Sequence, residues 1–380
     1  MMFDRRLIQH FDWGLMLLTL MICAVGLLTL HSAVSAGLDG GERSYFMKQM
    51  VWYGAGLVAM TAVMVFDYRN IDRWAYMIYC GILLLLIGVL LFGKMAGGSR
   101  RWLDFGPVSI QPSELAKIAV IFILARYYSK RVKPDGFSLR ELLYPSLLAL
   151  LPFGLIVEQP DLGTALTVVL ISGSITLFVK VERRTFLFLG AAGAITLPLV
   201  WFFLREYQKQ RILTFLDPNR DPLGAGYHII QSKIAIGSGM IAGKGFLRGT
   251  QNTLSFLPEQ HTDFIFSVLA EEWGFIGASF SVLLFLSLII WGLNIAYRCK
   301  DAFGTILAFG LIALIFWQTF INLGMVMGLL PVVGMPLPLI SYGGSSVLTI
   351  MICIGILMNI SMRQFATDES TSKMRSSRWW

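Results

Sequence analysis

The sequence predicts an all-α polytopic membrane protein with about ten transmembrane helices and a long external loop between the seventh and eighth spans. Of its 380 residues, 56% are hydrophobic and 14% are charged, whereas about a quarter of the residues in a soluble domain are charged. A third observation is the recurrence of apolar runs of roughly 20 residues, the length of a helix that crosses a bilayer. Residues 1–380 are expected to form a single transmembrane domain.

The apolar runs define the predicted spans in chain order. They cover residues 13–35, 47–66, 74–93, 113–128, 141–157, 162–180, 185–204, 264–297, 303–327 and 338–362. The run 264–297 is longer than one crossing, which predicts a tilt or an extension beyond the membrane. Beyond the last span, a disordered tail is expected at about 366–380.

Basic residues in the short connections predict the orientation. Most of them gather on one set of ends, and the opposite short connections hold Arg43, Lys48, Lys94, Arg100 and Arg101. Both termini are therefore expected to be cytoplasmic. The first span is expected to be retained, because it is a full bilayer long and lacks a small-residue cleavage site. This topology explains the formal net charge of +8 better than nucleic-acid binding does.

The connection 205–262 is the predicted external loop. It is rich in glycine and carries the spaced cations Arg211, Arg220, Lys233, Lys244 and Arg248. Glycines let backbone amides approach an anion closely, and the cations could hold phosphate oxygens. The alternative is a surface loop with short interfacial helices, in which glycine only supplies turns.

Glu114 and Lys117 interrupt the apolar background at the start of the fourth span. They lie one helical turn apart, so they can pair on one helix face. The alternative is structural: Ser113 caps the helix, Glu114 complements its positive end, and Lys117 extends to the membrane surface. Spacing leaves both interpretations open.

Two further polar clusters occur on the same predicted side. The segment 158–165 places Glu158 and Asp161 at the mouth of the sixth span, where Asp161 could also be a plain helix cap. The segment 328–346 contains Ser341 and is broken by proline and glycine, which indicates irregular backbone that lines a cavity. The convergence of carboxylates and cations on one side predicts a site at the outer leaflet.

The stretch 256–272, FLPEQHTDFIFSVLAEE, gathers Glu259, His261, Asp263 and two further carboxylates where an apolar helix begins. A carboxylate at the end of a membrane helix needs a partner, an ion or a chemical role. Asp263 is the best candidate for chemistry, because it opens the helix and follows a polar run. It would act as a general base if partly buried, whereas capping the helix is the alternative.

The predicted location narrows the chemistry. No nucleotide-sugar pool is expected outside the cytoplasmic membrane, so a transferase on that side needs a donor carried on lipid. A polyprenyl-pyrophosphate sugar fits a cationic, glycine-rich pocket beside an apolar groove.

Motifs along nearly the whole chain resemble the SEDS family (shape, elongation, division and sporulation). They are GSRRWLDFG, QPSELAK, EQPDLGTAL, RILTFLDPNRDPLGAGYHIIQSKIAIGSG, GKGF, GTQNTLSFLPEQHTDFIFSVLAEEWGFIG and LPLISYGGSS, in family order. FLPEQHTDFIF and VGMPLPLISYGGSS are closer to the family's rod-shape branch than to its division branch. The tail SSRWW matches no family pattern.

The resemblance implies a bacterial peptidoglycan glycosyltransferase of the inner membrane that polymerises lipid II during cell elongation and works with a class B penicillin-binding protein. By motif, Asp263 matches the family's essential aspartate, Glu114 and Lys117 its ion pair, and Asp161 a further functional acid. The remaining candidates for substrate binding or support are Arg101, Arg211, Glu259, His261, Lys244 and Ser341. A divalent cation, Mg²⁺ or Mn²⁺, is a candidate cofactor whose ligands the sequence does not identify.

The expected reaction is an inverting transfer in which Asp263 deprotonates the acceptor hydroxyl. Lys117, Arg101, Arg211 or a divalent cation would stabilise the leaving pyrophosphate. A lipid II flippase is the alternative, since a transporter also needs many spans and broken helices. A scaffold that only recruits the penicillin-binding protein is a third hypothesis. The gathering of charge at one face favours the enzyme.

Overall fold

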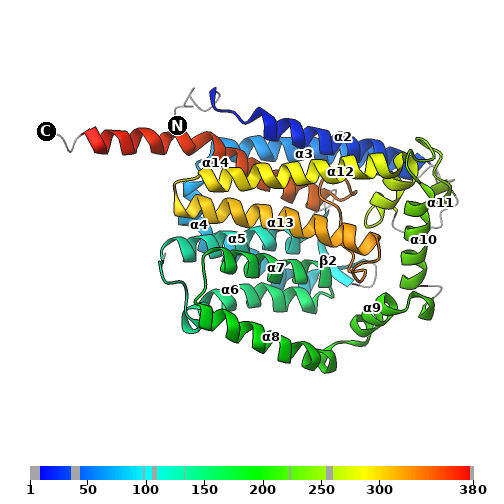
Figure 1. Cartoon of the computed structure of the whole chain (residues 1–380), viewed down its shortest axis with the longest axis horizontal. Helices are drawn as coiled ribbons and strands as arrows, with labels where there is room; N and C mark the ends of the chain where they lie inside the picture. The colour runs from blue at the N-terminus through cyan, green and yellow to red at the C-terminus, as the bar shows by residue number, and fades with distance from the viewer. Residues whose placement is uncertain are drawn as a thin grey trace.

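The computed structural model describes residues 9–35, 43–96, 99–104, 109–131, 133–221, 224–253 and 260–376. Long helices run alongside one another in one bundle (Figure 1). Their apolar composition is that of membrane spans. The predicted fold class, an all-α polytopic membrane protein, is confirmed.

Long helices occur at each predicted span. They are α2 (Trp13–Ser35), α3 (Arg43–Val65), α4 (Arg69–Phe92), α5 (Pro112–Ser129), α6 (Leu139–Glu158), α7 (Leu162–Phe178), α8 (Arg183–Phe203), α12 (Ile265–Arg298), α13 (Ala302–Val326) and α14 (Gly344–Ser376). In the described part of the chain, seven helices are long and apolar enough to cross a membrane, and α7 is a shorter apolar helix. The number of crossings therefore stays a prediction.

The predicted external loop is largely helical. It contains α9 (Glu206–Leu216), the 3-10 helix η1 (Pro218–Arg220), α10 (Ala225–Ser238) and α11 (Thr250–Thr253). A small antiparallel sheet contributes β1 (Lys94–Ala96), β2 (Ser99–Asp104) and β3 (Ser109–Ile110), in the order β1-β2-β3. We call the end of the bundle that carries α9 and α10 the loop end. The opposite end, where α2 begins and α14 leaves the bundle, is the tail end (Figure 1).

The last helix is longer than the sequence predicts. α14 continues to Ser376 and projects beyond the bundle (Figure 1), although disorder is expected from about residue 366. The segment 363–376 contains neither glycine nor proline, so no residue in it interrupts helical hydrogen bonding. Residues 377–380 lie outside the described part of the chain.

The long helix α12 is broken by the loop. Gly274 has non-helical backbone angles, with φ +63°, a conformation that favours glycine. The segment 240–245 supplies replacement hydrogen bonds at the break: Phe275 N donates to Met240 O at 2.8 Å, and Lys244 N donates to Glu271 O at 3.0 Å. The excess length of this predicted span is thus explained by a helix interrupted at its loop end.

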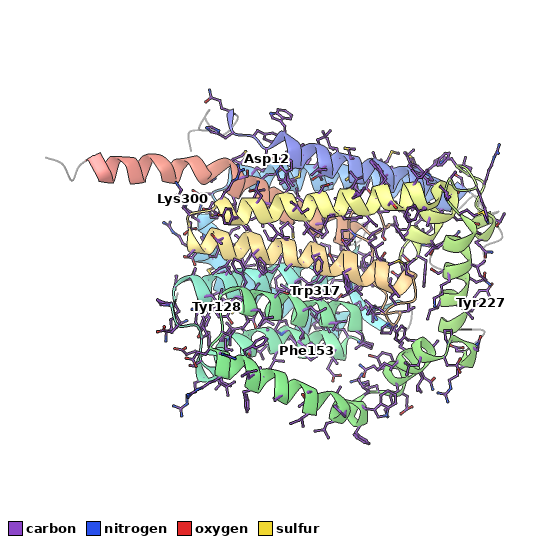
Figure 2. All side chains as sticks on the ribbon, viewed as in Figure 1. Asp12, Tyr128, Phe153, Tyr227, Lys300 and Trp317 are labelled. Carbon is purple, nitrogen blue, oxygen red and sulfur yellow. The ribbon has the colours of Figure 1, made fainter. Side chains whose placement is uncertain are left out.

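Burial differs sharply among the helices. Most of the apolar stretches of α13 and α14 are buried, whereas almost none of the apolar stretch of α8 is. Figure 2 shows Trp317 within the bundle, with Tyr227 at the loop end and Lys300 at the tail end. The core therefore lies around α13 and α14, and α8 runs along the edge.

Candidate active site

A cavity of about 540 Å³ opens at the loop end among the ends of several helices. Its charged lining comprises the carboxylates of Glu114, Asp161 and Asp263 and the guanidinium groups of Arg101 and Arg211. These side chains come from α5, the start of α7, the turn before α12, β2 and α9. The structure therefore brings together residues that the sequence marks as separate candidates.

Asp263 lies in the turn that precedes α12. That helix begins at Ile265, with Phe264 at the N-cap position and no side-chain capping hydrogen bond. Asp263 is therefore not at the cap position, which was the alternative to a chemical role. Gly334 is its neighbour across the cavity, and a Cβ built there would lie 3.3 Å from Asp263 Oδ2. With φ +72°, Gly334 both permits this backbone conformation and leaves room beside the carboxylate.

Asn322 fixes the main chain of this turn. Its Nδ2 donates to Asp263 O at 3.0 Å and to Met335 O at 2.6 Å. Asn322 is fully buried on α13. One amide group therefore joins the core helix, the turn that carries Asp263 and the irregular segment that faces it across the cavity.

Ser341 acts on the same turn from the other side. Its Oγ donates to Thr262 O at 2.6 Å and accepts from Leu337 N at 2.7 Å. Ser341 is 2% exposed and is not part of the cavity lining. His261, also absent from that lining, stacks on Tyr45 with ring centroids 4.8 Å apart. Both predicted residues therefore support the turn, and direct contact between either of them and substrate stays a prediction.

Glu114 and Lys117 form a buried ion pair. Lys117 Nζ lies 2.7 Å from Glu114 Oε1, and the lysine side chain is 0% exposed. Glu114 Oε2 has no hydrogen-bond partner, and Glu114 borders the cavity whereas Lys117 does not. The structural alternative is wrong in two respects. Lys117 does not extend to the surface, and Ser113 is not the cap of α5, because Gln111 occupies that position.

Asp161 caps a helix, which was one of the two interpretations from sequence, and it also makes further contacts at the cavity wall. Its Oδ1 accepts from Thr164 N at 3.3 Å, so it caps α7. Its Oδ2 accepts from Gln111 Nε2 at 2.9 Å and from Ser113 Oγ at 3.1 Å. Arg101 Nη1 lies 3.9 Å from Asp161 Oδ1. This carboxylate caps a helix and also ties three segments together at the cavity wall.

The two arginines give the cavity an anion-binding character. Burial and the neighbouring Arg101 lower the pKa of the Arg211 guanidinium, and the nearby carboxylates of Asp263 and Asp161 partly oppose that shift. Arginine remains protonated in proteins despite such a shift. A partly buried cation that faces another cation is stabilised by an anion placed between them.

Two carboxylates of α12 hold the external loop. Glu271 Oε1 accepts from Lys244 Nζ at 2.6 Å, from Thr250 N at 2.9 Å and from Thr250 Oγ1 at 3.0 Å. Glu272 Oε1 accepts from Ser32 Oγ of α2, and the Glu272 carboxylate also accepts from the backbone N–H groups of Leu247 and Gly249 in the loop. Both carboxylates are buried. We call the side chains of Glu271, Glu272, Lys244, Thr250 and Ser32 the loop clamp. Lys244, a candidate for substrate binding or support, belongs to this clamp and does not line the cavity, and its role toward substrate stays a prediction.

One predicted residue cannot be placed, and several lining residues were missed. Glu259 lies outside the described residues. The uncharged lining includes Trp102, Gln111, Thr262, Ser345 and Ser346. Trp102, Gln111 and the two serines fall inside the motifs WLDFG, QPSELAK and SYGGSS, so motif membership was the available signal. In the described part of the chain, no three His, Cys, Asp or Glu side chains are grouped to hold a metal ion.

Comparison with known proteins identifies the family. A model of the FtsW/RodA/SpoVE family, described as "Cell cycle protein", matches residues 11–365. The chain belongs to this family. It is 44% identical over 355 residues to the peptidoglycan glycosyltransferase MrdB of Escherichia coli, covering 92% of this chain and 93% of that protein. It is 36% identical over 432 residues to the peptidoglycan glycosyltransferase RodA of Treponema pallidum, covering 94% and 99%.

Solved structures of the family share the fold. One, described as "Structural coordination of polymerization and crosslinking by a peptidoglycan synthase complex", is 32% identical with a TM-score of 0.80, covering 93% of this chain and 98% of that one. The crystal structure of the rod shape determining protein RodA of Thermus thermophilus is 28% identical with a TM-score of 0.69 and the same coverage. The resemblance to the SEDS family is confirmed.

Proposed function

We propose that this protein is a peptidoglycan glycosyltransferase that polymerises lipid II during cell elongation. The observation that carries the proposal is the cavity at the loop end, where Asp263 shares one space with Arg101 and Arg211. Relatives that align over most of the chain bear the name peptidoglycan glycosyltransferase. A general base can activate the acceptor hydroxyl, and cations can stabilise the charge that develops on the leaving pyrophosphate.

In the proposed reaction Asp263 removes the proton from the 4-hydroxyl of N-acetylglucosamine on an incoming lipid II. That oxygen attacks the anomeric carbon of the growing strand and forms the new glycosidic bond with inversion. The bond from the anomeric carbon to the pyrophosphate breaks, and undecaprenyl pyrophosphate leaves with the electron pair. Asn322 and Ser341 support this step by holding the turn that carries Asp263.

Arg101 and Arg211 are the cations best placed to stabilise the leaving pyrophosphate, since both line the cavity. Lys117 was an equal candidate by sequence, but its ammonium is buried against Glu114. We therefore assign the Glu114–Lys117 pair to shaping the wall of the cavity. A divalent cation, Mg²⁺ or Mn²⁺, would need the pyrophosphate oxygens together with one or two of these carboxylates, which is a common arrangement for Mg²⁺.

We propose that the loop end faces outward from the bacterial inner membrane and that both termini are cytoplasmic. The support is the concentration of basic residues in the short connections of the tail end, following the positive-inside rule. In this orientation the cavity opens at the outer leaflet, where lipid-linked donor and acceptor are available.

A lipid II flippase would require a polar path that continues through the bundle. The charged cavity occupies the loop end. At the tail end, one pocket is lined by apolar and hydroxyl side chains, and a second adds the ammonium of Lys300 to such a lining. Of these three pockets, only the one at the loop end contains carboxylates, which favours transfer chemistry over transport.

The proposed partner is a class B penicillin-binding protein, which would cross-link the strands. A solved structure that shares this fold is described as a peptidoglycan synthase complex that coordinates polymerization and crosslinking. α12 exposes large apolar side chains, among them Phe275, Leu283 and Ile290, whereas α13 is mostly buried. A single membrane span of the partner would therefore pack against α12 more readily than against α13.

The test is polymerisation of lipid II by the purified protein, alone and with the class B penicillin-binding protein in the same membrane mimic. We expect glycan strands in both reactions and a faster rate with the partner, with photocrosslinks from α12 and from the loop. If no strands form under either condition and labelled lipid II is transported across vesicle membranes, the flippase hypothesis would replace the glycosyltransferase hypothesis.

A further inference from the structure

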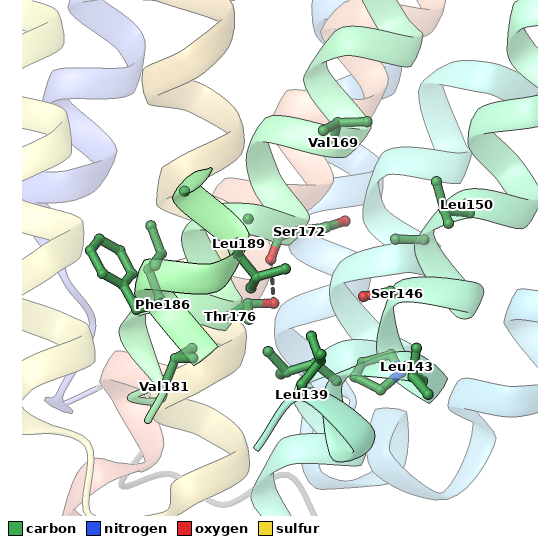
Figure 3. Close-up of a pocket in the computed structure, with 16 residues that line it drawn as sticks. Leu139, Leu143, Ser146, Leu150, Val169, Ser172, Thr176, Val181, Phe186 and Leu189 are labelled. Atoms are coloured by element: carbon green, nitrogen blue, oxygen red, sulfur yellow. Dashed lines mark hydrogen bonds between the residues drawn. The ribbon is translucent and has the colours of Figure 1, made fainter. Parts of the chain in front are cut away.

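We propose that a second lipid site, for an anionic phospholipid, lies at the tail end between α6, α7 and α8. A pocket of about 500 Å³ separates these helices, within the range of roughly 300–1,000 Å³ typical of small-ligand sites. Figure 3 shows Leu143 and Leu150 of α6 facing Val169 of α7 and Leu189 of α8 across this space. The site is distinct from the cavity that contains Asp263.

The pocket is suited to an acyl chain because its polar atoms are already satisfied or few. Ser172 Oγ donates to Val168 O at 2.7 Å, and Thr176 Oγ1 donates to Ser172 O at 2.8 Å. The other lining residues are mainly leucine, valine, alanine and glycine. An acyl chain that enters this space therefore contacts apolar surface, and the hydroxyl groups of Ser172 and Thr176 keep their hydrogen bonds within the helix.

The helix α8 has apolar surface that a lipid in this pocket would cover. Its apolar stretch is almost entirely unburied by protein, and Gly190 on the pocket wall has no atom near the position of a Cβ. Side chains of α8 such as Phe186 and Leu189 are more than 40% exposed. An apolar helix that packs so little against its own bundle is held in place by lipid.

Charge at the mouth of the pocket selects the headgroup. Arg140 follows the pocket residue Leu139, and Arg183 and Arg184 lie between the pocket residues Val181 and Phe186. The three arginines are exposed, and in the described part of the chain none of them forms an ion pair with a carboxylate. Basic pockets between transmembrane helices on the cytoplasmic side bind anionic headgroups.

Backbone hydrogen bonds join the two segments that carry the arginines, residues 133–141 and 180–184. Phe137 N donates to Lys180 O at 3.1 Å, and Glu182 N donates to Phe137 O at 3.1 Å. Acidic neighbours do not cancel the charge: residues 133–141 and 180–184 contain five basic and three acidic residues, and Glu141 is already paired with Lys133. The arginines therefore remain available to a phosphate at the membrane surface.

A lipid held here would influence the catalytic end as well. α8 ends at Phe203 and α9 begins at Glu206, so the edge helix runs almost directly into the helix that carries Arg211. Arg205 Nη2 lies 2.8 Å from Glu158 Oε2 at the end of α6. A phospholipid between α6 and α8 would thus fix the relative position of two helices that lead to the cavity wall.

The experiment is native mass spectrometry of the full-length protein in detergent, titrated with dioleoyl-phosphatidylglycerol or dioleoyl-phosphatidylcholine. We expect retained phosphatidylglycerol at concentrations where phosphatidylcholine is lost. The variant Arg183→Gln/Arg184→Gln should bind phosphatidylglycerol roughly tenfold or more weakly, because each basic residue near a membrane surface contributes about 1 kcal/mol. The matched control is Arg69→Gln/Arg298→Gln, which removes two exposed arginines of the tail end that do not border this pocket, and it should bind like wild type.

A second variant tests the acyl-chain part of the site. Gly190→Leu fills the pocket from α8 without contacting protein at its Cβ position, and it should also reduce retention while leaving the unfolding temperature without lipid unchanged. Equal retention of the two lipids, or unchanged binding by the Arg183→Gln/Arg184→Gln variant, would overturn the proposal. Displacement of phosphatidylglycerol by lower concentrations of undecaprenyl phosphate would also overturn it, because the site would then belong to the polyprenyl carrier.

Discussion

The cavity and the loop clamp place carboxylates from one short stretch in two different settings. Asp263 borders an open space together with Arg101 and Arg211. Eight residues further along, Glu271 is buried and its Oε1 accepts hydrogen bonds from Lys244 and from the loop backbone. The first setting leaves room for a substrate, whereas the second is filled by the protein itself. Carboxylates that look equivalent in sequence therefore differ in what they face.

This comparison assigns chemistry to the cavity and loop positioning to the clamp. Two Lys–Glu pairs repeat the contrast, with N–O distances of 2.7 Å for the buried pair Glu114–Lys117 and 2.6 Å for the partly buried pair Lys244–Glu271. One pair borders the cavity and the other fastens the loop to α12. Substitutions in each region should consequently separate effects on rate from effects on stability.

The largest effect is expected for Asp263→Asn. Asparagine keeps the shape of the side chain but cannot accept the acceptor proton, so polymerisation should fall by about 10²- to 10⁴-fold. The unfolding temperature should not change, because the residue at the cap position of α12 is Phe264. Gel analysis of glycan strands checks the loss of polymerisation, and thermal unfolding in detergent checks the unfolding temperature. Substantial polymerisation by this variant would exclude the base assignment.

The Glu114–Lys117 pair should show the next largest effect, on stability. Removing one partner leaves a buried charge, so Glu114→Gln or Lys117→Met should each cost about 3–5 kcal/mol, and the double variant less than the sum. Denaturant or thermal unfolding measures the cycle. Ala substitutions at the exposed pair Lys209–Glu206 are the control and should cost less than about 1 kcal/mol. Additive losses at 114 and 117 would show that the two side chains act separately.

Glu271→Gln should loosen the loop more than it changes chemistry. Loss of the charged hydrogen bond to Lys244 is expected to cost about 1.5–3 kcal/mol, and amide exchange should accelerate across residues 239–251. Hydrogen–deuterium exchange by mass spectrometry reports this directly. If polymerisation disappeared while amide exchange in the loop stayed at the wild-type rate, Glu271 would have to be assigned to the reaction and not to the loop clamp.

The smallest effect is expected for Ser341→Ala. It removes the hydrogen bonds to Thr262 O and from Leu337 N, at a cost of about 1 kcal/mol for each bond. A residue that only positions the turn should lower kcat with little change in KM, which steady-state assays distinguish. Ser287→Ala is the control, because that exposed hydroxyl bonds only the carbonyl of Leu283 in its own helix. A rise in KM with kcat unchanged would instead indicate contact between Ser341 and substrate.

Apolar length and motif spacing predicted most of the architecture, because a helix that crosses a bilayer must be long and apolar whatever surrounds it. Spacing alone could not determine which loop side chains point into the cavity. Lys244 and Ser341 lie in glycine-rich or proline-rich segments, where backbone direction changes at single residues such as Gly334. Asn322 was missed for another reason: it lies in a long apolar run whose few polar residues, Gln318 among them, do not indicate which backbone groups they contact.

The central claim is that Asp263 acts in the chemical step and not in holding substrate. The most direct test measures equilibrium binding of lipid II to purified wild type and Asp263→Asn, alongside glycan formation by the same preparations. We predict affinities that agree within about twofold while the rate of strand formation by the variant falls by about 10²- to 10⁴-fold. A loss of affinity as large as the loss of product, or strand formation near the wild-type rate, would contradict the account.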